Sequence, residues 1–129
     1  MKTKSLAYAV LVVSLLLATV PVFAHHGGAA YDNTKVVQVA GTVTSFQFIN
    51  PHCIVLFDAK APNGDVQHWT METPAPSMMK HGGWYKDMMK PGDQISAGLH
   101  IARNGSYVGK IAGDGIVING KQVDAPSDK

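Results

Sequence analysis

Apolar and polar residues alternate along several segments of the chain, a pattern typical of half-buried β-strands. Within that first segment, residues 36–48, the alternation changes phase, because Val43 has one parity whereas Phe46 and Phe48 have the other. A strand changes phase when one extra residue is inserted, so we predict a β-bulge within residues 41–45. A long, bent first strand is what a small β-barrel needs to curve around its own core.

Further strand-like segments follow and are separated by turn residues. Pro62-Asn63-Gly64-Asp65 and Asn104-Gly105 predict tight turns, since Asn and Gly tolerate positive φ angles. Between the third and fourth strands, Pro and Gly residues enclose a segment in which we expect a short helix capped by Ser77 and a second turn over residues 84–89. The later strands are expected at residues 52–59, 66–72, 94–103 and 106–112, with a final small hairpin of residues 116–118 and 121–123.

Three strands, a short helical insert and two more strands follow one another in the order of an oligonucleotide/oligosaccharide-binding (OB) barrel. We therefore predict a mainly β protein, a small OB-like five-stranded barrel with a helical insert between strands 3 and 4. An open β-sandwich is the alternative. The barrel domain is expected over residues 36–123, after a flexible N-terminal segment, 25–35, and before a disordered tail, 124–129.

The first 24 residues have the pattern of a secretory signal peptide. Lys2 and Lys4 form a positive start, residues 6–20 form an apolar run, and Ala24 supplies the small residue of a cleavage site. We expect cleavage after Ala24, a periplasmic location and no membrane association of the mature chain. An uncleaved membrane anchor is the alternative, but the run is shorter than the ~20 apolar residues that a spanning helix needs.

Composition and charge exclude several classes of protein. The chain is 46% hydrophobic, which is too apolar for an intrinsically disordered protein. Its length of 129 residues is too short for a multidomain enzyme. Removal of Lys2 and Lys4 leaves nine basic side chains against nine acidic ones, so no basic surface indicates a nucleic-acid partner. Cys53 is the lone cysteine and lies in an apolar run, which predicts a buried thiol.

Five short motifs follow one another along the chain: His25-His26-Gly27, Gly41-Thr42-Val43, Asn50-Pro51-His52, Gly83-Trp84 and Lys90-Pro91-Gly92-Asp93. With this ordered set, the chain resembles a family of small exported bacterial proteins of unknown function. The resemblance covers about residues 25–103 and implies a periplasmic β-barrel, with no activity or ligand attached. Four methionines of the insert lie where the pattern has mostly Leu or polar residues.

The amino terminus created by cleavage is the strongest candidate site. The α-amine and imidazole of His25 can chelate one metal ion, and a further imidazole would complete a histidine brace. Alternatively, His26 can bind Cu²⁺ in a square plane through the amine, an amide nitrogen and its imidazole. Nitrogen ligands in tetragonal geometry select Cu²⁺ among the divalent ions, so copper is the expected cofactor. A flexible, solvated terminus without a physiological metal is the alternative.

Soft thioether sulfurs suit Cu⁺, and the methionines of the insert, with a histidine among them, supply such ligands. Methionine is also a common filler of irregular cores, which is the alternative for these residues. His52 follows Asn50-Pro51 at a strand start and either fixes the loop through a hydrogen bond or ligates the metal. The weaker metal-ligand candidates are therefore His52, Met78, Met79, His81, Met88 and Met89.

Hydrolytic chemistry has little support. The chain lacks a G-x-S-x-G elbow, a P-loop and a dinucleotide fingerprint, and Glu72 is its only glutamate, so no Glu pair can act as acid and base. The sequence predicts a periplasmic binding protein, a copper carrier or buffer. The alternative is a non-catalytic interaction module of the cell envelope that docks a partner through Trp69 and Trp84. A copper oxidase built on His25 is a third hypothesis.

Overall fold

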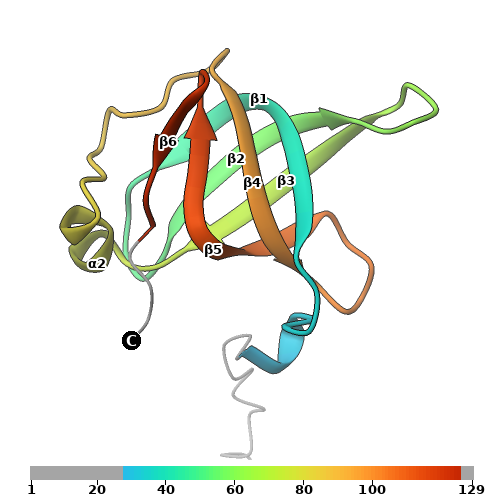
Figure 1. Cartoon of the computed structure of the whole chain (residues 1–129), viewed down its shortest axis with the longest axis horizontal. Helices are drawn as coiled ribbons and strands as arrows, with labels where there is room; N and C mark the ends of the chain where they lie inside the picture. Colours follow the sequence, from blue (N-terminus) through green and yellow to red (C-terminus); the bar gives the residue numbers. More distant parts are fainter. Residues whose placement is uncertain (1–27, 126–129) are drawn as a thin grey trace, which may run out of the picture.

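The computed structural model describes residues 28–125, and five strands of this part form a closed barrel (Figure 1). The sheet order is β3-β2-β1-β4-β5, and a short parallel pairing of β3 with β5 closes it. The strands are β1 (Val37–Gln47), β2 (Cys53–Lys60), β3 (Val66–Thr73), β4 (Gln94–Ile101) and β5 (Val108–Ile118). The predicted OB-like five-stranded barrel is confirmed.

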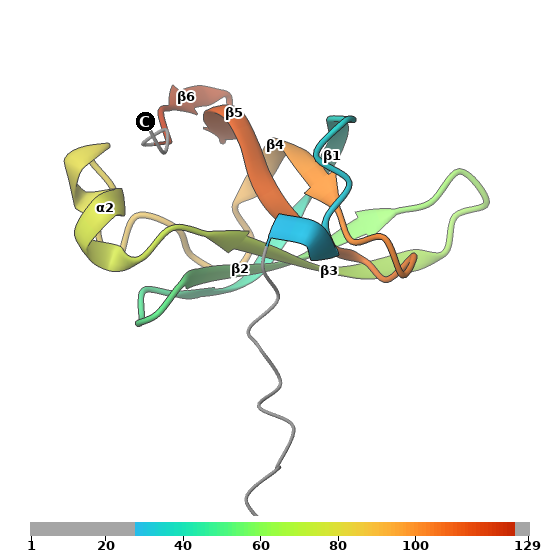
Figure 2. The same ribbon diagram turned by 90° about the horizontal axis from the view of Figure 1, so that it is seen from below.

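Three short elements accompany the barrel. The 3₁₀ turn η1 (Gly28–Ala30) precedes β1, helix α2 (Pro76–His81) lies between β3 and β4 as predicted, and β6 (Lys121–Val123) pairs with β5. Both views place α2 and the end of β6 on one side of the barrel, while the β2–β3 hairpin projects from the opposite side (Figures 1 and 2). Within residues 28–125, no helix is long and apolar enough to cross a membrane.

Strand β1 pairs with β4 through its first half and with β2 through its second half. Its register against β2 shifts between Val43 and Ser45, which confirms the predicted bulge. The extra residue lets Val43 face the core while Phe46, of opposite parity, still packs against the same core. Gly41 lies just before this point, where a Cβ would come within 2.3 Å of the Asp58 carbonyl oxygen.

Strand β5 is longer than the sequence indicated. The expected break after Ala112 is absent, and β5 continues to Ile118 before the turn at Asn119-Gly120. Gly115 has a φ of 120°, and a Cβ there would lie 2.0 Å from the Val123 carbonyl oxygen. Glycine thus lets the strand bend toward β6 without ending, whereas in the sequence it resembles a strand terminator.

A hydrogen bond joins the insert to the segment that follows β6. Helix α2 begins at Pro76 with Ala75 as its N-cap, so Ser77 is not the cap that we predicted. The Trp84 indole nitrogen donates a hydrogen bond of 2.6 Å to the Asp124 carbonyl oxygen. The first residue of the predicted tail is therefore bonded to the insert, and residues 126–129 lie outside the described part.

Asp93 closes the insert. Its carboxylate accepts hydrogen bonds from the Lys90 backbone nitrogen, at 2.8 Å, and from the Asn119 side-chain amide, at 3.0 Å. The Asn119 amide first, and then the Lys90 N–H, hold the pKa of Asp93 below its usual range. One exposed carboxylate thus ties the end of the insert to the β5–β6 turn.

We expect Gly41→Ala to destabilise the fold by at least about 2 kcal/mol, because the added methyl group meets backbone that cannot move aside. Urea unfolding measures the change. Ala40→Val is the matched control, since Ala40 is exposed on the same strand, and it should change stability by less than about 0.5 kcal/mol. Equal stability of Gly41→Ala and the parent would contradict the close approach of β1 and β2.

Asp93 should also make stability depend on pH. Since its folded pKa is lowered, its stabilising contribution is present above the unfolded pKa of about 3.9 and is lost as pH falls through the folded value. Urea midpoints measured from pH 6 to pH 3 should therefore fall less steeply for Asp93→Asn than for the parent. Asn119→Gly, which removes the amide but suits the positive φ of 48°, should flatten the curve as well. Parallel curves for all three proteins would contradict the assignment.

Candidate functional site

Two cavities lie on the outer surface of the β3–β5 seam and share two residues, Tyr31 and Glu72. The smaller has a volume of about 230 Å³ and the larger about 490 Å³. The larger cavity is bounded by the β4–β5 loop and by η1. The residues that line the smaller cavity are Gly28, Tyr31, Pro51, His52, Glu72, Thr73, Pro74, Ala75, Met78 and Lys110.

Tyr31 anchors the N-terminal segment between the two cavities. Its hydroxyl donates a hydrogen bond of 2.6 Å to Glu72 Oε2, and its side chain is buried. Its backbone forms a β-bridge with Ala102, and its carbonyl oxygen accepts a bond of 3.1 Å from Arg103 Nε. Residues 28–35 of the segment that we expected to be flexible are therefore attached to the barrel where β4 ends (Figure 1).

Two side chains of opposite charge, Glu72 and Lys110, line the smaller cavity. Glu72 lies opposite Lys110 in the β3–β5 pairing, and both side chains are half-buried at the cavity. Burial, and then the hydrogen bond to the Glu72 carboxylate, raise the pKa of the Tyr31 hydroxyl. The tyrosine thus stays a neutral donor, and Glu72 is held as its acceptor.

The structure brings two of the eight predicted metal ligands to this cavity. His52, exposed just before β2, and Met78, exposed on α2, both line it. His25 and His26 lie outside the described residues. They precede Gly28, which lines the same cavity, by three and two positions.

The other candidate ligands lie elsewhere. Met79 and Met89 are buried in the core, and Met88 packs against it, as expected of methionine used as a core filler. His81 is exposed at the end of α2 and does not line the cavity. Among residues 28–125, no three His, Cys, Asp or Glu side chains converge as a metal-binding group.

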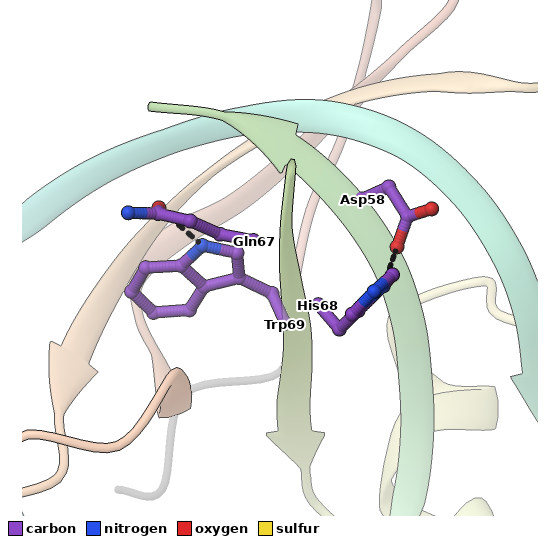
Figure 3. Close-up of polar contacts among 4 residues, drawn as sticks. All are labelled: Asp58, Gln67, His68 and Trp69. Carbon is purple, nitrogen blue, oxygen red and sulfur yellow. Dashed lines mark hydrogen bonds and ion pairs between the residues drawn. The ribbon is translucent and has the colours of Figure 1, made fainter. Parts of the chain in front are cut away.

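The remaining histidines make separate contacts on the barrel surface. Figure 3 shows alternation along β3, with His68 facing Asp58 on one side of the strand and Trp69 on the other. His68 Nδ1 lies 2.7 Å from Asp58 Oδ1, and the histidine side chain is 82% exposed. His100 Nδ1 lies 2.9 Å from the Lys35 carbonyl oxygen. Neither histidine lines the smaller cavity.

Both tryptophans are interior residues, which argues against the alternative in which they present a docking face. Trp69 is 8% exposed, stacks on Phe57 and is covered by Tyr107. Trp84 is 2% exposed and lies edge-on to Phe46, with its indole nitrogen bonded to the C-terminal segment. One tryptophan thus fills the barrel and the other holds the insert against it.

Sequence reasoning missed Glu72 and Tyr31 as members of a site. We considered Glu72 only as the lone glutamate that excludes an acid–base pair. One feature of the sequence could have indicated a role for Glu72. It is a charged residue on a predicted strand between Met71 and Thr73, both of which are buried in the structure. The contact with Tyr31 spans 41 positions in sequence, so no local pattern could have revealed it.

Comparisons with known proteins yield one match. A model described as a family of unknown function, DUF6152, matches residues 12–111. No curated protein and no solved structure matches the chain.

We expect Cys53 to be unreactive in the folded protein. The residue is fully buried and unpaired, as predicted, and burial raises the pKa of its thiol, which disfavours the reactive thiolate. A thiol-specific chromogenic reagent should therefore react with less than a tenth of the native protein in the time that labels the urea-unfolded protein completely. Equal labelling rates, or a disulfide-linked dimer on a non-reducing gel, would contradict the buried position.

Proposed function

The chain belongs to the DUF6152 family, a family of unknown function, and we propose that it is an exported periplasmic protein that binds copper as a carrier or buffer. One observation carries the proposal. His52 and Met78 line the same cavity as Gly28, the residue that follows His25-His26-Gly27 in the sequence. Two candidate ligands that are distant in the sequence thus line one cavity, and the chain that precedes Gly28 carries the two adjacent histidines.

Covalent geometry supports the participation of both terminal histidines. Consecutive Cα atoms are about 3.8 Å apart, so the Cα atom of His26 lies within about 8 Å of that of Gly28, and His25 within about 11 Å. A histidine side chain extends this reach further. Cleavage after Ala24 would give His25 a free α-amine, which would add a nitrogen donor on the chain that leads to the cavity.

The donor chemistry of the cavity suits copper in either oxidation state. Imidazole and amine nitrogens are good ligands for Cu²⁺, and the thioether of Met78 suits Cu⁺. The cavity volume of about 230 Å³ is below the ~300–1,000 Å³ of typical pockets for organic ligands. A metal ion with a few side-chain ligands is small enough to fit this cavity.

An interaction module of the cell envelope is the second candidate function. Because both tryptophans are buried, a docking surface would have to use other residues of the insert. Tyr85 is 59% exposed and lines a cavity of about 360 Å³ together with Met88 and residues of β6. Substitution of the exposed Tyr85 would test whether a partner docks on this surface.

We expect the untagged, secreted protein to have a mass that begins at His25 and to bind one Cu²⁺ ion with visible d–d absorption. The double variant His25→Ala/His26→Ala should lose at least tenfold in affinity, measured by competition with a chromogenic chelator. His81→Ala is the matched control, since His81 is exposed and does not line the cavity.

Three results would count against this proposal. The first is a mature chain that retains Ala24, which would remove the amine of His25 from the site. The second is a double variant that binds Cu²⁺ as tightly as the parent. The third is an equal loss of affinity in His81→Ala, which would indicate adventitious binding by surface histidines.

A further inference from the structure

We infer that Glu72 is a ligand of the metal ion in the smaller cavity and that Tyr31 positions the Glu72 carboxylate. Glu72 then contributes mainly to the binding of Cu²⁺, and Met78 mainly to the binding of Cu⁺. The inference rests on the proposed function for the identity of the ion. Its evidence is separate from the terminal histidines, because Glu72, Tyr31, His52 and Met78 all line the cavity within the described residues.

Glu72 is a half-buried carboxylate on the outer face of strand β3. Its side chain is half-buried, and an ionised carboxylate removed from water needs strong partners. A carboxylate offers about four lone-pair positions, and the Tyr31 hydroxyl, 2.6 Å from Oε2, occupies one of them. Oxygen positions therefore remain for a cation in the cavity that Glu72 lines together with His52.

Tyr31 has the place of an outer partner of a metal ligand. Ligating carboxylates and imidazoles are commonly held by a further hydrogen bond, which fixes their orientation and tunes their affinity. Tyr31 is itself fixed by Arg103 Nε on its carbonyl oxygen and by the bridge to Ala102. The same residue thus orients Glu72 and holds the segment that leads to the terminal histidines.

Charge and softness separate the roles of the two side-chain ligands. Carboxylate oxygen is a hard donor and stabilises the more highly charged Cu²⁺, whereas the thioether of Met78 is soft and favours Cu⁺. Lys110, opposite Glu72 in the sheet, supplies a positive charge at the same cavity and offsets the carboxylate before metal arrives. Loss of Glu72 should therefore weaken binding of Cu²⁺ far more than binding of Cu⁺.

The test compares Cu²⁺ and Cu⁺ affinities of the full secreted protein with single variants. Cu²⁺, added as its sulfate, is measured by chelator competition and by electron paramagnetic resonance. Cu⁺ is measured anaerobically against a Cu⁺-specific chelator. We expect Glu72→Gln to weaken Cu²⁺ binding at least tenfold, to change the copper hyperfine splitting and to alter Cu⁺ binding less than threefold. Met78→Leu should show the reverse selectivity.

Two further variants separate ligation from a structural effect. Tyr31→Phe keeps the buried ring but removes the hydroxyl, and it should shift the hyperfine splitting and weaken Cu²⁺ binding by a smaller factor than Glu72→Gln. Asp87→Asn is the matched control, since Asp87 is an exposed carboxylate of the insert that does not line the cavity. It should leave affinity and spectrum unchanged.

The outcomes distinguish this inference from the proposed function. An unchanged spectrum and Cu²⁺ affinity in Glu72→Gln would overturn the inference, even if the double histidine variant loses copper. Loss in Glu72→Gln with no loss in the double histidine variant would uphold a site within the barrel and refute the terminal one. If Glu72→Gln does not fold, Tyr31→Phe decides, and an unchanged spectrum in that variant overturns the inference.

Discussion

The pairing of β3 with β5 is the contact on which the rest of the structure depends. It covers only Thr70–Glu72 against Val108–Lys110, yet it converts an open sheet into a barrel. Closure removes the exposed edges of two strands and encloses the core around Met71 and Leu99. It also places Glu72 beside Lys110 on the outer surface, where Glu72 accepts the hydrogen bond from Tyr31. The pairing that closes the barrel therefore also brings Glu72 and Lys110 to the candidate site.

Much of the barrel could be predicted from the sequence, because alternation of apolar and polar residues reports which side of a strand is buried. The change of parity between Val43 and Phe46 was sufficient to locate the bulge in β1. Glycine carries no such information about sides. A strand end and a bend in a continuous strand both favour glycine at positive φ, and the predicted strand over residues 106–112 stopped just before Gly113 and Gly115.

The candidate site was harder to predict, because its members are joined only by tertiary contacts. His52 and Met78 were suggested by residue type, but nothing local separated Met78, which lines the cavity, from Met79, which lies in the core. Glu72 and Tyr31 were not suggested at all. A hydrogen bond between residues 41 positions apart becomes visible only when the N-terminal segment is placed against the barrel.

The anchoring of Tyr31 has a consequence for how the proposed copper site is assembled. A ligand on a short tether acts at a high effective concentration, which falls as the tether lengthens. Cleavage is expected after Ala24, and five residues, 26–30, then separate the new terminal residue His25 from Tyr31. Because Tyr31 is fixed by Glu72 and Arg103, the anchored end of this tether stays at the cavity. In the proposed site, export would therefore do more than deliver the protein, since signal cleavage would create a ligand already tethered beside its partners.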